Sequence, residues 1–326
     1  MHMVIKKILY FAFGIICGIA FTQQEQQYTQ YMVNPYTINP ALGGTEDFID
    51  IKFGYRKQWV GLESAPRTYY LTGHTTLGKE SNVSGYHHRG EHTSWHGVGG
   101  YIYSDRTGPI SRSAFYGQYA FNMPLTRQVR LSVGSFFGIK QFSYDLTGLR
   151  REDFTDEVLP NNRLVQILPD VSLGAWVYSK FWYFGASAFQ LLQNNISFNQ
   201  FVTDPNFENG KLISHFFVTG GGKLAASEEL TVVPSFAIKG APNTPVSVDL
   251  NVKIDYNDQF FGGLSYRVGD AFAIIAGAVI EKTVEISYSY DLTTSDLRKV
   301  SNGSHEIVLG LRLKHPKHIL CASSFW

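Results

Sequence analysis

The feature that most constrains this fold is a strict two-residue alternation of apolar and polar side chains that recurs along the chain. The stretch VSVDLNVKIDY, residues 246–256, puts Val, Leu, Ile and Tyr on one face and Ser, Asp, Asn and Lys on the other. Successive side chains of a β-strand point to opposite faces of the sheet, so this segment predicts a strand with one apolar and one polar face. A soluble β-sandwich would bury the apolar face in a core, whereas a membrane barrel would turn it towards lipid.

About fourteen strands are predicted beyond residue 45, several of them with clean alternation over about ten residues, which is typical of transmembrane barrels. They are expected near residues 47–59, 66–78, 93–104, 109–123, 128–141, 169–179, 181–192, 212–225, 229–238, 245–256, 258–267, 270–281, 283–291 and 303–314. The fold class predicted from this pattern is an all-β, transmembrane antiparallel β-barrel.

The lengths of the connections favour the membrane barrel. Connections from even to odd strands are mostly tight, whereas those at 142–168, 193–211 and 292–302 are long and join odd to even strands. Outer-membrane barrels have short periplasmic turns and longer outer loops, so both termini are predicted to be periplasmic. One connection disagrees, because residues 79–92 are long but fall on the tight-turn side. A soluble sandwich would not require this asymmetry, and at this length it would be expected to split into two domains.

The N-terminus has the layout of a secretory signal peptide. Lys6 and Lys7 precede an apolar run from Ile8 to Phe21, and a Gln-rich segment follows. A run of about 14 apolar residues is short for a membrane-spanning helix, which needs about 20. No later run in the sequence is long enough either, so an integral membrane form of this chain has to be a closed barrel. We predict a signal peptide at 1–22 and a cell outer-membrane location.

The polar faces of the strands are predicted to line a lumen. Charged residues make up only 17% of the chain, against about 25% in soluble domains. The net charge of +1 gives no basic field for nucleic acid. The residues chosen as lumen-facing are Asp249, Asn251, Lys253, Asp255 and Arg312. Inward charges of both signs would either pair and close the lumen or line a path for solutes. Arginine is expected to be costly at Leu250, in lipid, and far better tolerated at Asn251.

No catalytic or metal-binding pattern stands out. His88, His92 and His96 have the spacing of metal ligands on a helix, but glycines surround them and a strand follows, so a polar loop is predicted. The chain has two cysteines, and Cys17 lies within the predicted signal peptide. Cys321 would then be the one cysteine of the mature chain, so no disulfide framework is expected. No nucleophile elbow and no phosphate-binding loop of the expected spacing occurs. We predict no enzymatic activity, no metal site and no cofactor.

Three segments carry a resemblance to a known family. They are QQYTQYMVNPYTINPALGG, IKFGYRKQWVGLESAPRTYYLTGHTTLG and, near the end, YDLTTSDLRKVSNGSHEIVLGLRL. Together they closely resemble the PorP/SprF family of type IX secretion system membrane proteins of Bacteroidota. The motif residues chosen as structural or partner-binding are Asn34, Pro35, Asn39, Pro40, Arg56, Gln58, Trp59, Gly61, Pro66, His74, Ser304, His305 and Glu306.

The resemblance implies an outer-membrane barrel that works with the type IX machinery. Members of the family support the export or surface retention of secreted clients, notably gliding adhesins with a C-terminal targeting domain, and others are linked to periplasmic components. We therefore expect a non-enzymatic barrel that binds such a client domain through its long outer loops and upper lumen. A small-solute or fatty-acid-type channel is the alternative.

The Asn-Pro pairs at 34–35 and 39–40 exclude regular helix and strand in the segment before the barrel. At the periplasmic mouth, this segment would either fold inward as a plug or contact periplasmic partners. The predicted organisation is therefore a plug-like segment at 23–45 and a barrel at 46–326.

Overall fold

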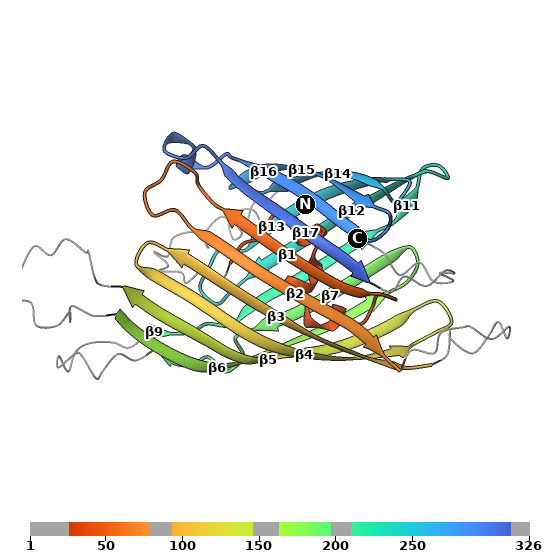
Figure 1. Ribbon diagram of the computed structural model, residues 1–326, viewed down its shortest axis with the longest axis horizontal. Helices are drawn as coiled ribbons and strands as arrows, with labels where there is room; N and C mark the ends of the chain where they lie inside the picture. Colours follow the sequence, from red (N-terminus) through yellow and green to blue (C-terminus); the bar gives the residue numbers. More distant parts are fainter. Residues whose placement is uncertain (1–25, 79–92, 146–162, 197–209, 314–326) are drawn as a thin grey trace, which may run out of the picture.

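The computed structural model describes residues 26–78, 93–145, 163–196 and 210–313. They form a closed antiparallel β-barrel of 14 strands, seen from the side in Figure 1. The first seven are β1 (Ile49–Lys57), β2 (Arg67–Leu77), β3 (Trp95–Thr107), β4 (Ile110–Pro124), β5 (Arg130–Asp145), β6 (Arg163–Tyr178) and β7 (Trp182–Phe189). The other seven are β10 (His215–Gly222), β12 (Leu230–Gly240), β13 (Ser247–Tyr256), β14 (Phe260–Arg267), β15 (Ala271–Ile280), β16 (Val284–Thr293) and β17 (Ser304–Leu313).

Each barrel strand pairs with its neighbours in chain order, and β1 pairs with β17 to close the ring. The short β11 (Leu224–Ala225) continues β10 along the edge of β12. A two-stranded sheet of β8 (Asn195–Ile196) and β9 (Gly210–Lys211) lies outside the ring order. The predicted fold class is confirmed, while the side of the membrane on which the termini lie stays a prediction. None of the described helices has the length and apolar character to cross a membrane.

The largest difference from the predicted strands is in β5 and β6. The sequence assigned 142–168 to a connection, but β5 continues to Asp145 and β6 begins at Arg163. Phe142 of this extension packs with Ile196 and Leu212 in a small hydrophobic cluster of its own. The contact comes from a remote part of the chain, so local alternation gave no sign of it.

The outer face of the barrel is apolar. Leu250, Leu264 and Ile274 expose 52%, 50% and 48% of their surface, and similar side chains recur on every strand around the ring. An exposed apolar surface of this extent is unfavourable in water and is typical of a lipid-facing barrel wall. In β13 the Val, Leu and Ile of VSVDLNVKIDY are on this outer face, so the apolar face covers no soluble core.

The protein's buried core lies inside the barrel, where the segment before β1 is packed. Residues 28–46, here called the plug segment, are buried throughout, and in Figure 1 they are the red ribbon within the ring. The segment contains three 3₁₀ helices, η1 (Gln30–Met32), η2 (Pro35–Thr37) and η3 (Pro40–Leu42). Pro35 and Pro40 each begin a helix, where a missing N–H costs nothing. Asn39 caps the last of them by accepting a hydrogen bond of 2.9 Å from the Ala41 N–H.

Candidate functional site: the filled lumen and the rim with the long connections

The first contact between the barrel wall and the plug segment is a buried ion-pair network around Arg56. Its guanidinium lies 2.9 Å from Glu306 and 2.8 Å from Asp291. Thr29 of the plug segment donates from its N–H to Glu306 at 2.8 Å and from its hydroxyl to Asp291 at 2.6 Å. Arg56 in turn donates to the Thr29 hydroxyl. The plug segment is thus hydrogen-bonded into a network in which one buried guanidinium lies between two buried carboxylates, and loss of Arg56 would leave both without their cation.

A second charged group lies nearer the start of β1. The Lys52 ammonium donates to the Val33 carbonyl of the plug segment at 2.6 Å, and it lies 3.4 Å from Asp50 and 3.8 Å from Glu285. Arg312 pairs with Glu285 at 2.6 Å. Lys52 therefore joins the plug segment to the charges of β1, β16 and β17.

A third group lies on β12 to β14. Asp249 accepts from Lys239 at 2.6 Å and lies 3.4 Å from Arg267. Beside them the Asn251 amide donates to the Tyr31 hydroxyl of the plug segment at 2.6 Å. The Lys239 ammonium also lies 4.7 Å from the centre of the Tyr31 ring, within the range of a cation–π contact.

The wall formed by β4 to β7 holds the plug segment differently, through its backbone. Side chains of this wall donate to three backbone carbonyls of the plug segment: Gln118 to Pro40 at 2.8 Å, Ser132 to Ala41 at 2.5 Å and Ser187 to Ile38 at 2.5 Å. In the opposite sense, the Asn39 amide donates to the carbonyls of Ala175 and Ala186 at 3.1 and 3.2 Å. These bonds join neutral groups, without ion pairs.

Close approach of the two backbones depends on missing side chains at the wall. A Cβ added at Gly134 would lie 2.6 Å from the Pro40 oxygen and 2.8 Å from the Ala41 Cα, closer than real Cβ contacts. At Gly97 an added Cβ would collide with the backbone of Gly43. Glycine at these positions is what lets η3 and the residues after it lie against the strands.

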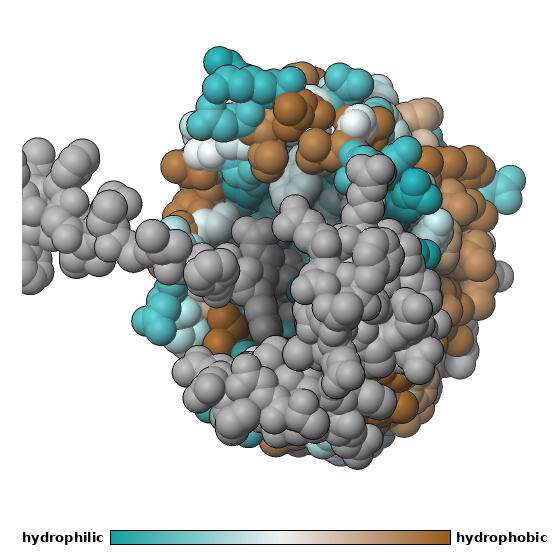
Figure 2. Space-filling model, turned by 90° about the vertical axis from the view of Figure 1, so that its left-hand side faces the viewer, coloured by the Kyte–Doolittle hydropathy of each residue, from teal (hydrophilic) through white to brown (hydrophobic). Residues whose placement is uncertain are grey.

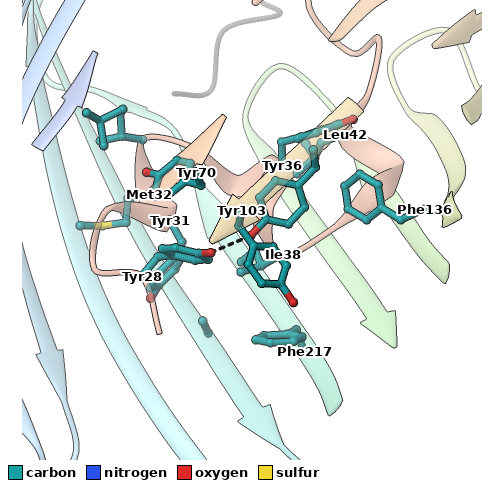
Figure 3. Close-up of a cluster of buried hydrophobic side chains, with 14 of the residues drawn as sticks. Tyr28, Tyr31, Met32, Tyr36, Ile38, Leu42, Tyr70, Tyr103, Phe136 and Phe217 are labelled. Atoms are coloured by element: carbon teal, nitrogen blue, oxygen red, sulfur yellow. Dashed lines mark hydrogen bonds between the residues drawn. The ribbon is translucent and has the colours of Figure 1, made fainter. Parts of the chain in front are cut away.

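Tyrosines fill the space between these contacts (Figure 3). The Tyr28 and Tyr101 hydroxyls are 2.7 Å apart, and Tyr36 packs edge-on against Phe136 with ring centres 5.1 Å apart. Burial raises the pKa of Tyr36 well above its usual range, so its phenol stays neutral. The lumen at this level is a packed core.

A cavity lies at the end of the barrel with the tight turns. Its volume is about 40 Å³, and Lys253, Asp255, Phe261 and Arg312 are among its lining residues. Lys253 and Asp255 pair with each other at 3.1 Å within it. All five residues chosen as lumen-facing therefore lie inside the barrel, and their charges are paired.

The motif residues separate into two groups in space. One group lies in or against the plug segment: Asn34, Pro35, Asn39, Pro40, Arg56, His74 and Glu306. The other lies at the rim with the long connections: Gln58, Trp59, Gly61, Pro66 and Ser304. His305 belongs to neither group, since it is on the outer face of β17 and its imidazole lies 2.6 Å from the Tyr288 hydroxyl.

At the rim, the connections 58–66 and 294–303 are joined to each other. The Val60 N–H donates to the Gly303 carbonyl at 2.8 Å, and the Asn302 N–H donates to the Val60 carbonyl at 2.6 Å. The Trp59 N–H donates to the Ser304 hydroxyl at 3.1 Å. Figure 2 looks onto this end, where hydrophilic residues gather along the upper rim and hydrophobic residues cover much of the outside of the barrel. We call these two connections together the paired rim loops.

Some residues of the lumen were not anticipated. Asp50 and Lys52 of β1, Asp291 of β16 and Arg267 of β14 are buried inside the barrel but were not among the residues chosen as lumen-facing. Of the three histidines with metal-ligand spacing, His88 and His92 lie outside the described residues. His96 contacts Tyr119 on the outer face. Within the described part of the chain, no group of His, Cys, Asp and Glu has an arrangement suited to a metal ion.

The chain is similar to known proteins in sequence and in structure. The sequence model for the type IX secretion system membrane protein PorP/SprF matches residues 20–311. Among curated proteins, none matches the sequence. Among solved structures, the chain is similar to the toluene transporter TbuX of Ralstonia pickettii, with 10% identity over 89% of this chain and 94% of that one and a TM-score of 0.48. It is also similar to a Pseudomonas aeruginosa FadL homologue, with 8% identity over 81% of this chain and 88% of that one and a TM-score of 0.45.

Proposed function

Because this chain belongs to the PorP/SprF family of type IX secretion system membrane proteins, we propose that it is a receptor for a secreted client of that system. The protein is a multi-pass β-barrel of the outer membrane and a partner of the type IX machinery. In the proposal it is not an enzyme. It binds the C-terminal targeting domain of a client, such as a gliding adhesin, and supports export or surface anchoring of that client.

The observation that carries the proposal is the filled lumen. The plug segment contacts β1, β13, β16 and β17 on one side and β4 to β7 on the other, so nothing the size of a folded domain passes through the barrel as it stands. A barrel with a packed interior presents its loops and its outer wall to partners. This favours a role in holding a client at one end over a role as an open pore.

The paired rim loops are the part of that end for which we propose client contact. Their backbones are hydrogen-bonded to each other, which fixes their shape before a partner arrives and lowers the entropic cost of binding. They lie on the same side as the other two long connections. With both termini in the periplasm, this side faces the cell exterior, where an anchored adhesin is needed.

The alternative, a small-solute or fatty-acid-type channel, requires the plug segment to leave or shift. Many of the contacts that hold the plug segment are hydrogen bonds and ion pairs. Water is able to replace these contacts, which would allow the plug segment to move. Ion conductance across a planar bilayer in the absence of a client would favour this alternative.

Co-purification tests the receptor role. The tagged protein is extracted from outer membranes in mild detergent, and proteins bound to it are identified by mass spectrometry. We expect an adhesin or its C-terminal domain to be recovered. Recovery of the barrel without any such client would contradict the proposal.

Two rim variants locate the contact. Val300→Arg changes a 56% exposed residue of the paired rim loops, and Val268→Arg changes a 53% exposed residue of another connection at the same end. We expect client recovery to fall strongly for Val300→Arg and to be retained for Val268→Arg. Equal recovery with the two variants would remove the paired rim loops from the interface.

A further inference from the structure

Three basic side chains form a row across the outer face of β1, β2 and β3. Lys57 is directly opposite Arg67 in the ladder between β1 and β2. Arg67 is directly opposite Arg106 in the ladder between β2 and β3. All three point outward, because their neighbours Arg56, Thr68 and Asp105 are buried inside the barrel. The row lies at the end of the barrel that carries the long connections.

This arrangement is electrostatically unfavourable by itself. Like charges directly opposite on paired strands repel each other. Among the described residues, no carboxylate forms an ion pair with Lys57, Arg67 or Arg106. At the same end, the outward residues Ile238, Val246, Tyr266 and Val268 are uncharged. In β1–β4, β10 and β12–β17, which the structure describes in full, these three are the charged side chains of the outer face. Three cations at one place favour binding of an anion, and the described residues do not supply one.

The depth of the row is set by the aromatic residues beside it. One outward position closer to the barrel middle, Tyr55 and Tyr69 pack with ring centres 4.8 Å apart. One further position inward lie Phe53 and Leu71, which are 42% and 43% exposed. Tyrosines mark the interface between hydrocarbon and headgroups in membrane barrels. The row is thus at the level of the lipid headgroups, just beyond the hydrocarbon.

We propose that Lys57, Arg67 and Arg106 bind the phosphate groups of lipid A in the outer leaflet. Arginine donates two parallel hydrogen bonds to a phosphate, and lysine contributes a point charge. A phosphorylated glycolipid at this place neutralises the row while its acyl chains cover Phe53 and Leu71. The choice of leaflet follows the orientation proposed above, whereas the site itself does not depend on client binding.

Binding of added lipid is measured by native mass spectrometry on the purified full-length protein in detergent. The wild type is expected to bind bisphosphorylated lipid A. The variant with Lys57→Gln, Arg67→Gln and Arg106→Gln is expected to bind it at least about tenfold more weakly, because each basic residue at an anionic surface adds affinity. Enzymatically dephosphorylated lipid A is expected to show the same weakening with the wild type.

Two controls make the result specific. Arg127→Gln, Lys180→Gln and Lys282→Gln remove the same charge from exposed turns at the other end and are expected to leave binding unchanged. Lys57→Arg, Arg67→Lys and Arg106→Lys keep the charge and are expected to keep binding. Unchanged binding by the triple Gln variant would overturn the site. Equal binding of phosphatidylglycerol would overturn its assignment to lipid A. Neither outcome alters client recovery, so failure here is distinguishable from failure of the receptor proposal.

Discussion

The two walls that hold the plug segment use opposite means. The wall of β1 and β12 to β17 reaches it with charged side chains, and Arg56, Lys52 and Lys239 each contact both a plug residue and a wall carboxylate. The wall of β4 to β7 lets its backbone come close, through small residues and neutral hydrogen bonds. The stability of the first wall should therefore be sensitive to loss of a charge, and that of the second wall to an added side-chain volume. Five substitutions test that distinction, from the largest expected effect to the smallest.

Arg56→Leu is expected to have the largest effect. It leaves Glu306 and Asp291 buried without their cation, and breaking a buried pair in this way typically costs about 3–5 kcal/mol. The free energy of unfolding is followed in urea by the heat-modifiable migration of the barrel on a gel. Arg298→Leu, at an exposed position of the rim, is the control. Identical unfolding midpoints for the two variants would mean that the charged wall does not hold the plug segment.

Gly134→Ala tests the other wall by adding volume. The new Cβ would lie 2.6 Å from the Pro40 oxygen, and overpacking of this kind costs about 1–3 kcal/mol. Gly73→Ala is the matched control, since its added Cβ meets nothing closer than 3.9 Å. The unfolding midpoint is expected to fall only for Gly134→Ala. Equal midpoints would show that the plug segment does not lie against β5.

Asn39→Ala removes neutral contacts without adding volume. The amide loses its bonds to the carbonyls of Ala175 and Ala186, and η3 loses its cap, for a combined cost of about 1–2 kcal/mol. Limited proteolysis after residue 28 is expected to accelerate, because the plug segment leaves its wall more often. Gln128→Ala in an exposed turn should leave the cleavage rate as it is.

The smallest effects are expected for two single hydroxyl groups, one on each wall. Ser132→Ala removes a bond to the Ala41 carbonyl, and Ser287→Ala removes a bond to the Gln30 side chain. Each is expected to cost about 0.5–1.5 kcal/mol of unfolding free energy, because both bonds join neutral groups. A much larger cost for Ser287→Ala than for Ser132→Ala would show that neutral hydrogen bonds on the charged wall are also stronger than those on the other wall.

The sequence predicted the wall of the barrel better than its contents. The alternation of apolar and polar residues is a local property of the sequence. It predicted about fourteen strands and, in β13, β16 and β17 where it is strictest, also which residues face inward and which face outward. The extension of β5 and β6 depends on Phe142 meeting Ile196, a contact between distant parts of the chain. The local alternation of residues does not predict contacts between distant parts of the chain.

The state of the lumen was the main gap. Two Asn-Pro pairs left open whether the first segment folds inward or meets a partner, and the mixed inward charges left open whether the lumen is closed. The expectation that arginine fits at Asn251 assumed a wet lumen. Asn251 is only 3% exposed and donates to Tyr31, so an arginine there would displace the plug segment. Where the plug segment lies against the wall, an inward position is a core position.

The motif residues show a similar limit. The resemblance selected Arg56, His74 and Glu306 without indicating that they face the plug segment, and it selected His305, which faces outward beside Tyr288. Lys57, Arg67 and Arg106 of the outer row do not form a recognisable motif in the sequence. Their register became visible only when three strands were paired.

Ion conductance of the wild-type protein in a planar lipid bilayer is the most direct test of the central claim, that the lumen is filled. The account predicts no ion conductance for the full-length protein. It also predicts stepwise conductance once residues 28–45 are deleted from a barrel that still shows heat-modifiable migration. Stepwise conductance of the undisturbed wild type, equal to that of the deletion variant, would contradict the account.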